Sequence, residues 1–265
     1  MRSELGADEC RGFIAELAEL LPGLLGGQSS DPMFAPLTEK LDTGYRQKWD
    51  PVFTGGAIVG LLLSDPAASP PSKTKDIDLV LEISGYFEFA AVERILRRSG
   101  FSQNPIENMP VVAWYWKNIR VDFLPHLPME MMSKTNRWFP HLIEEAEWIE
   151  VIAGKFAWRA SAACFVATKF EAFFNRGKGN YLESKDIEDI IAVVDGREEL
   201  IGEINLASPE IRQFVRASFG ELLETPDFME AIPQIVTDEL REGIVTDRMR
   251  KISTADRESK SQLEP

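Results

Sequence analysis

Apolar positions along the chain follow two different periods, and the period changes near residue 159. Between residues 51 and 158, short apolar runs alternate with segments rich in glycine and proline, which is typical of strands joined by turns and short helices. Beyond residue 159, apolar residues recur at steps of three and four, the period of an amphipathic helix. We therefore expect an α+β fold, in which a mixed or antiparallel sheet with flanking helices is followed by a helical domain.

The same pattern predicts the individual elements. Strands are expected at residues 51–54, 76–83, 111–116, 119–124, 148–152 and 155–158. Helices are expected at residues 8–25, 57–63, 86–99, 160–176, 184–195, 208–224 and 227–242. These elements divide the chain into an N-terminal helical segment (1–50), a sheet-containing core (51–158), a C-terminal helical domain (159–252) and a charged tail that we expect to be disordered (253–265).

Two aspartates lie one residue apart in the second predicted strand. Because side chains of a strand alternate between its faces, Asp76 and Asp78 point to one side and the apolar residues beside them to the other. Neighbouring carboxylates repel each other, and a divalent cation between them removes the repulsion. Oxygen ligands of this kind suit Mg²⁺, which usually binds together with phosphate groups. Solvated acids at a strand end are the simpler alternative for this pair.

Two further features can join the aspartate pair at one site. Asp122 is the single acid of the strand 119–124, and it converges with the pair if the two strands are neighbours. Gly55 and Gly56 form a turn between a strand and a short helix, where backbone N–H groups can bind phosphate and no side chain blocks its approach. Three acids and a glycine turn in this arrangement predict one or two metal ions that hold a triphosphate.

Composition narrows the classes of function. The 265 residues carry a net charge of −14, which argues against general nucleic-acid or DNA binding but allows a local basic patch. No apolar run approaches the ~20 residues of a membrane span and the first residues include acids, so we expect a cytoplasmic protein with no signal peptide and no membrane partner. Cys10 and Cys164 are expected to be reduced, and with His126 and His141 they match no zinc-finger spacing.

The order of these motifs resembles that of a known family. The Gly-Gly turn, the Asp-x-Asp strand and the later strand aspartate are similar to those of the nucleotidyltransferase superfamily typified by polymerase beta. Ala57 stands where many members have serine, a departure familiar in the abortive-infection toxin-like (AbiEii-like) branch. The resemblance implies a polymerase beta-like nucleotidyltransferase core over the sheet-containing part of the chain.

The helical half adds two motifs that resemble the same branch. Residues 167–176 are similar to its lysine-bearing helix, and residues 184–190 to its Lys-Asp-x-x-Asp-Ile motif. At about 100° per residue, Lys169 falls near the centre of an apolar helix face. An ammonium there needs an anionic partner, either a bound triphosphate or a carboxylate such as Asp186. Asp186 borders the apolar stripe of its own helix and Asp189 lies further round toward solvent, so we expect Asp186 to be the inward acid.

The resemblance covers residues 52–195 and implies roles for single residues. The metal ligands for one or two Mg²⁺ ions would be Asp76, Asp78 and Asp122, and the last of these would help deprotonate the acceptor. The NTP-binding residues would be Gly55, Gly56, Lys75 and Lys169. Asp186 would orient the lysine or bind substrate, so that the catalytic set is Asp76, Asp78, Asp122, Lys169 and Asp186.

These roles predict an enzyme that transfers a nucleoside monophosphate from an NTP to an acceptor. The resembled branch implies RNA, such as a tRNA 3′ end, or a protein as acceptor, and a toxin paired with an antitoxin. Transfer to a small molecule such as an antibiotic is an alternative, because the acidic chain attracts cationic acceptors. A catalytically silent nucleotide- or partner-binding module is another.

Several of the same residues also have purely structural explanations. Lys169 can extend to water along apolar surface, and Asp186 can be an acid favoured by a helix N-terminus, with Ser184 as its N-cap. Residues 176–179 fit a solvated linker as well as a phosphate contact, and the tryptophans are expected in the core.

Overall fold

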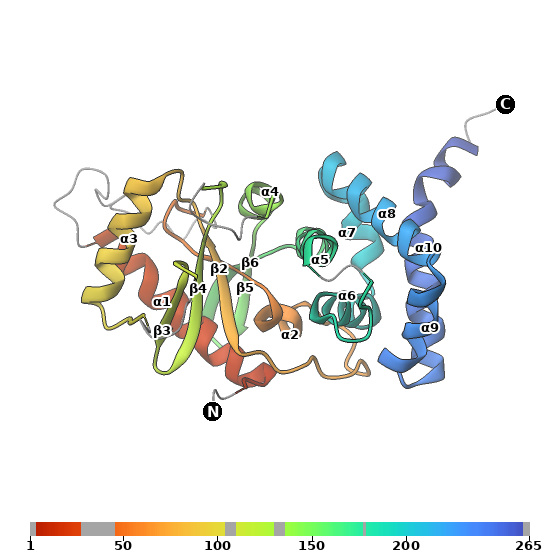
Figure 1. The fold of residues 1–265 in the computed structure, drawn as a ribbon, viewed down its shortest axis with the longest axis horizontal. Coiled ribbons are helices and arrows are strands. Elements are labelled where there is room, and N and C mark those ends of the chain that lie inside the picture. The colour runs from red at the N-terminus through yellow and green to blue at the C-terminus, as the bar shows by residue number, and fades with distance from the viewer. Residues whose placement is uncertain (1–3, 28–45, 104–109, 130–135, 177–178, 262–265) are drawn as a thin grey trace. The chain divides into compact units, whose positions relative to one another are not determined.

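The computed structural model describes residues 4–27, 46–103, 110–129, 136–176 and 179–261 (Figure 1). Backbone contacts divide the chain into two compact units. The sheet unit comprises Met1–Leu61 and Ser72–Ser161, and the helical unit comprises Leu62–Pro71 and Ala162–Pro265. The chain therefore passes between the units three times, and the segment 62–71 belongs to the helical unit although the sheet unit flanks it on both sides.

In its described residues, the sheet unit is built on six strands in the order β3-β4-β2-β1-β6-β5. Their bounds are β1 Val52–Thr54, β2 Asp76–Leu81, β3 Ala113–Trp116, β4 Ile119–Pro125, β5 Glu147–Ile152 and β6 Lys155–Arg159. The sheet is mixed, because β2 and β4 run parallel, as do β1 and β6, whereas the other neighbours are antiparallel. The predicted α+β class is confirmed, and each of the six predicted strands forms.

One face of the sheet is a closed apolar core. Strand alternation places Phe53, Ile77 and Phe123 on this face, and their side chains are completely buried. Helix α1 (Ala7–Gly27) covers it, since Phe13 packs edge-on against Trp116 with ring centroids 6.3 Å apart. Helix α3 (Tyr86–Arg98) covers it as well (Figure 1), and we call it the core face. The opposite face, which carries Thr54, Asp78 and Asp122, is named the carboxylate face.

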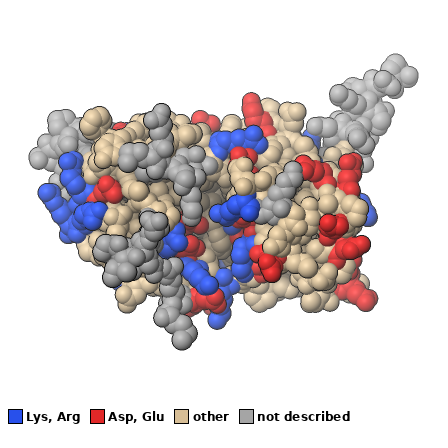
Figure 2. All heavy atoms as spheres, viewed as in Figure 1, with Lys and Arg blue, Asp and Glu red and all other residues tan. Residues whose placement is uncertain are grey.

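Charge is unevenly spread over the sheet unit. The second half of α3 exposes Arg94, Arg97 and Arg98, and Figure 2 shows basic side chains gathered over this helix. Cations near a helix C-terminus are stabilised by the helix dipole. The local basic patch that the net charge allows is therefore present, and it lies over the core face rather than the carboxylate face.

The described part of the helical unit contains six helices. They are α5 Ala162–Arg176, α6 Lys185–Gly196, α7 Leu200–Leu206, α8 Pro209–Leu223, α9 Pro226–Ile235 and α10 Glu239–Ser261. Aromatic rings fill its centre, where Phe170 packs edge-on against Phe219 with centroids 4.9 Å apart. Ser184 caps α6 as predicted, because its hydroxyl accepts a hydrogen bond from the Ile187 N–H at 3.4 Å.

The chain after residue 226 differs from its prediction. A single helix was expected at 227–242 and disorder from residue 253, but α9 ends at Ile235 and α10 continues to Ser261. Val245, Met249 and Ile252 of α10 are buried at a spacing of three to four residues, and this apolar stripe gives the charged helix its packing. Helices α4 (Phe139–Glu144) and α7 were not predicted. Residues 28–45 of the predicted N-terminal helical segment (1–50) and residues 262–265 of the predicted tail lie outside the described residues.

None of the helices in the described ranges is long and apolar enough to cross a membrane.

Candidate carboxylate and glycine-loop site

The three predicted carboxylates meet on two neighbouring strands. In the parallel pair β2–β4, Asp78 lies directly beside Asp122, and Asp76 lies beside Arg120. All four side chains project from the carboxylate face, because residues in register in a sheet share a face. Asp122 is 2% exposed, whereas Asp76 and Asp78 are half-buried. The strands β2 and β4 are thus neighbours, and their register brings the three acids into one group, the acid group.

Gly55 fits against this group in a way that only glycine permits. It follows β1 with φ 70° and ψ −169°, a backbone region that is essentially closed to residues with a Cβ. A Cβ at this position would lie 2.0 Å from Oδ2 of Asp78. The turn therefore holds its backbone directly against a carboxylate, and it leads into the 3-10 helix Gly56–Ile58 and helix α2, Val59–Leu62.

Arg120 neutralises part of the acid group. Its guanidinium donates two hydrogen bonds of 2.6 Å to the carboxylate of Asp122, and its Nη1 lies 3.9 Å from Asp76. Burial lowers the pKa of Arg120, but the hydrogen bond and charge of Asp122 raise it, as do the charges of Asp76 and Asp78, and the net shift is upward. The positive charge of Arg120 thus interacts favourably with the negative charges of all three acids.

The donor set fits a magnesium ion that has two protein carboxylates. Within the described residues, no three His, Cys, Asp or Glu side chains are arranged to hold a metal ion together. Mg²⁺ needs fewer ligands than this, since it usually binds through one or two carboxylates, water and substrate phosphates. Asp76 and Asp78 provide such a pair, while both oxygens of Asp122 are bound to Arg120.

Lys75, predicted to bind nucleotide, is well exposed next to the acid pair. Its side chain is 63% exposed, and its ammonium lies 3.6 Å from Glu4 in an ion pair. The preceding Thr74 donates a hydrogen bond of 3.2 Å to Oδ1 of Asp76. The backbone of Thr74 also bonds to Leu5, which ties the N-terminal segment to the start of β2.

The predicted lysine and acid of the helical unit form a compact ion cluster. Lys169 is half-buried, with a side chain that is 11% exposed, and its ammonium lies 2.5 Å from Asp189 and 3.5 Å from Asp186. The expectation that Asp189 faces solvent is wrong, because Asp189 is only 6% exposed and makes the shorter contact. Helix α6 turns both acids inward, so the buried face of this helix is broader than its apolar stripe indicated.

Asp186 has a second partner that links the cluster to solvent. Arg176, 62% exposed at the end of α5, donates two hydrogen bonds of 3.0 Å to its carboxylate. Burial raises the pKa of Asp189, the charge of Lys169 lowers it, and the net shift is upward. The cluster balances two cations against two acids, so the anionic partner that Lys169 requires is supplied by the helical unit itself.

The predicted site residues thus form two groups, one in each unit. Gly55 and the strand acids belong to the sheet unit, and Lys169 with Asp186 belongs to the helical unit. Sequence reasoning missed Arg120, although its position two residues before Asp122 places it on the same face of a strand. It also missed the ion pair of Arg176, because helix-to-helix contacts are not encoded in local spacing.

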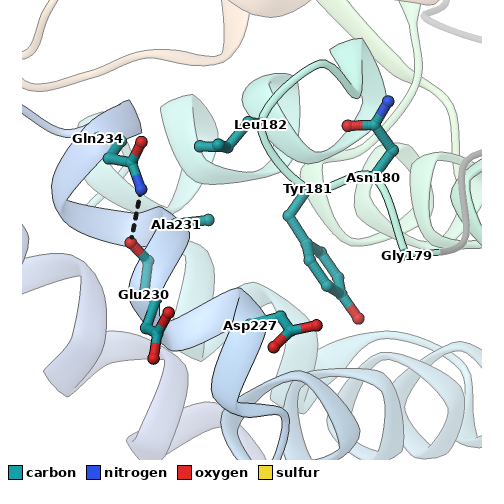
Figure 3. Close-up of a pocket in the computed structure, with 8 residues that line it drawn as sticks. All are labelled: Gly179, Asn180, Tyr181, Leu182, Asp227, Glu230, Ala231 and Gln234. Atoms are coloured by element: carbon teal, nitrogen blue, oxygen red, sulfur yellow. Dashed lines mark hydrogen bonds between the residues drawn. The ribbon is translucent and has the colours of Figure 1, made fainter.

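A separate hollow in the helical unit contains none of the predicted site residues (Figure 3). It lies between α9 and the segment before α6, where the Tyr181 ring packs on Phe173 and Phe228. Its wall combines exposed carboxylates and amides with apolar groups, and it is lined by Gly179, Asn180, Tyr181, Leu182, Asp227, Glu230, Ala231 and Gln234.

Comparisons with known proteins give little to set beside this geometry. No protein-family model matches the chain, and no curated protein matches it. Among solved structures, the crystal structure of JHP933 from Helicobacter pylori is similar over 80% of this chain and 88% of that protein, with 13% sequence identity and a TM-score of 0.40. A similarity at that level carries no argument about the activity of either site.

Proposed function

We propose that the protein is a Mg²⁺-dependent nucleotidyltransferase with a polymerase beta-like core. The observation that supports this most strongly is the register of β2 and β4, which places Asp78 beside Asp122 while the Gly55 backbone lies against Asp78. A carboxylate pair next to a side-chain-free turn suits a metal-bound triphosphate, since the anion can approach the backbone closely. The AbiEii-like branch of the superfamily is part of the same proposal.

The reaction joins an acceptor oxygen to the α-phosphorus of an NTP. The bond from that phosphorus to the pyrophosphate oxygen breaks, pyrophosphate leaves, and the acceptor hydroxyl loses its proton. Asp76 and Asp78 would hold the Mg²⁺, whose charge stabilises the phosphoryl oxygens in the transition state. Asp122 would help to take the proton, which requires that Arg120 release one of the two Asp122 oxygens to which it donates.

The remaining residues would bind the triphosphate. Gly55, Gly56 and the exposed Lys75 would contact the β- and γ-phosphates, through backbone N–H groups and an ammonium. In the helical unit, Lys169 would neutralise charge on the triphosphate, and Asp186 would orient Lys169 or bind substrate, as the resemblance implies. The acceptor would be RNA, such as a tRNA 3′ end, or a protein, and a toxin of this kind would have an antitoxin partner.

Two other functions each have an observation in their favour. The net charge of −14 favours a cationic small-molecule acceptor on the same core. The Arg120–Asp122 pair favours a catalytically silent nucleotide-binding module, because it neutralises the third acid without a metal.

Incubation with labelled NTPs separates these functions. Purified protein is supplied with each α-labelled NTP, Mg²⁺ and total tRNA. Labelled RNA or labelled protein supports the proposal and identifies the acceptor, and label on an added aminoglycoside supports the small-molecule alternative. Tight NTP binding without transfer to any acceptor supports the silent module. The double variant Asp76→Ala with Asp78→Ala should lose transfer, and activity that survives it refutes the site assignment.

A further inference from the structure

The carboxylate face also carries a stack of aromatic rings. Trp148 of β5 and Phe156 of β6 lie nearly parallel, with ring centroids 5.8 Å apart and an interplanar angle of 15°. Trp158 packs against Trp148, with their ring centroids 5.1 Å apart and an interplanar angle of 48°. Trp158 is buried, but Trp148 is 49% exposed and Phe156 is 42% exposed. The expectation that tryptophans lie in the core is therefore wrong for Trp148.

Strand register shows that these rings and the acids share one face. Thr54 of β1 lies beside Asp78, and Val52, two residues earlier, lies beside Trp158. Trp158 in turn lies beside Trp148. Residues in register project to the same side of a sheet, and positions two apart in a strand also share a side. The aromatic rings therefore face the same way as Asp78 and Asp122, and they belong to β6 and β5 at one edge of the sheet.

The spacing between the two groups follows from sheet geometry. Asp78 and Trp148 are three strands apart and offset by two residues, which is roughly 14 Å across the strands and ~7 Å along them. The resulting separation of Asp78 and Trp148 is close to the distance between the phosphates and the base of an extended nucleotide. The surface at the rings is unsuited to phosphate, because Glu150 lies beside Phe156 on the same face.

We propose that Trp148 and Phe156 form a stacking platform for a nucleobase whose phosphates are held at the Gly55 and Asp78 end. Planar bases stack on aromatic side chains, and the contact tolerates any base because each has a π-face. The proposal rests on the function proposed above. It extends that function by assigning a subsite for the base, which belongs either to the donor NTP or to a nucleotide acceptor.

Binding measurements separate the base subsite from the phosphate site. Calorimetric titration with Mg²⁺ compares four NTPs with tripolyphosphate, which has no base. The variants Trp148→Leu and Phe156→Leu should bind NTPs about 5- to 150-fold more weakly, the loss expected for one stacked base (~1–3 kcal/mol). Tripolyphosphate binding should be unchanged. Phe87→Leu is the matched control, since Phe87 is 80% exposed on α3 and should leave both affinities as they are.

Each outcome has a distinct meaning. Equal NTP affinity in the wild type and both platform variants, together with unchanged binding of a short RNA oligonucleotide, overturns the platform while leaving the phosphate site intact. A loss confined to the oligonucleotide assigns the platform to the acceptor base. Failure of tripolyphosphate to bind the wild type refutes the proposed function instead. If the variants do not fold, photo-cross-linking of a nucleotide to the wild type must label Trp148 or Phe156, and labelling only elsewhere refutes the platform.

Discussion

Gly55 and Asp78 depend on each other at the centre of the candidate site. The positive φ of Gly55 and the 2.0 Å that would separate an added Cβ from Asp78 are distinct penalties for any other residue. Arg120 has the same importance for Asp122, because a carboxylate that is 2% exposed needs a cation or several hydrogen-bond donors. Each of these two pairs therefore predicts a specific effect when one of its members is substituted.

Replacing Gly55 by alanine should destabilise the protein more than the backbone conformation alone requires. Strain at such a position costs roughly 1–3 kcal/mol, and the displaced Asp78 adds to it. Gly154→Ala is the matched control, because Gly154 has φ +74° but nothing within 4 Å of an added Cβ. Urea unfolding measures both variants, and an equal loss in the two would show that Asp78 is not constrained by Gly55.

Removing Arg120 should strengthen divalent-cation binding. Arg120→Met frees both oxygens of Asp122 and removes a positive charge from the acid group, so we expect Mn²⁺ affinity to rise about tenfold (~1.4 kcal/mol). Mn²⁺ titration followed by electron paramagnetic resonance measures this directly, without any assay of activity. Arg94→Met on the surface of α3 is the control, and weaker Mn²⁺ binding by Arg120→Met would show that Arg120 does not compete with metal.

At the scale of elements, the two units are organised by charge in different ways. The strands β2 and β4 collect three acids around one arginine, whereas helices α5 and α6 pair two acids with two cations. The segment 62–71 is fixed to the end of α6, since the backbone N–H groups of Ser64 and Asp65 donate to the carbonyl of Gly196 at 2.8 and 2.9 Å. Arg241 of α10 pairs with Asp65 and Asp195 in the same place.

Loss of Lys169 should destabilise the protein, because the ion cluster then lacks its half-buried cation. Lys169→Met leaves Asp189 buried without its cation, which costs ~3–5 kcal/mol for a broken buried pair. Because the pKa of Asp189 is already raised in the folded state, protonation favours folding, and stability of the variant should decline as pH rises above the unfolded carboxyl value. Unfolding from pH 4 to 8 tests this, and the added substitution Asp189→Leu should restore part of the loss.

The attachment of the segment 62–71 can be tested at Gly196. An added Cβ would lie 2.7 Å from Leu63 and 3.0 Å from Ala68, so Gly196→Ala should cost about 1–3 kcal/mol through overpacking. Gly202→Ala in α7 has nothing within 4 Å and should instead stabilise by roughly 0.5–1 kcal/mol. Thermal unfolding that moves both variants in the same direction would contradict this packing.

At the scale of the whole chain, sequence pattern predicted some features well and others poorly. Alternation in β2 was enough to put Asp76 and Asp78 on one side, because the period of a strand is fixed. Alternation could not give the register between β2 and β4 that sets Asp122 beside Asp78. The segment 62–71 lies mostly between the predicted helix 57–63 and the predicted strand 76–83, and its membership of the helical unit depends on contacts with residues over a hundred positions away.

Exposure was the hardest property to predict. Trp148 looked like a core residue and is half exposed, while Asp189 looked solvated and is buried. Both errors have one cause, since apolar or polar character indicates a preference but the partner element decides which side is covered. The length of α10 was missed for a related reason, because its apolar stripe is sparse and depends on packing against α6 and α8.

The central claim is that Asp76, Asp78 and Asp122 catalyse transfer of the α-phosphorus of an NTP to an acceptor. The most direct measurement compares the same NTP labelled at the α- or the γ-phosphorus, with Mg²⁺ and the acceptor that accumulates label. The account predicts that α-label enters the acceptor, that γ-label appears only in pyrophosphate, and that Asp78→Asn abolishes the transfer. γ-Label on the acceptor, or undiminished α-label transfer by Asp78→Asn, would contradict it.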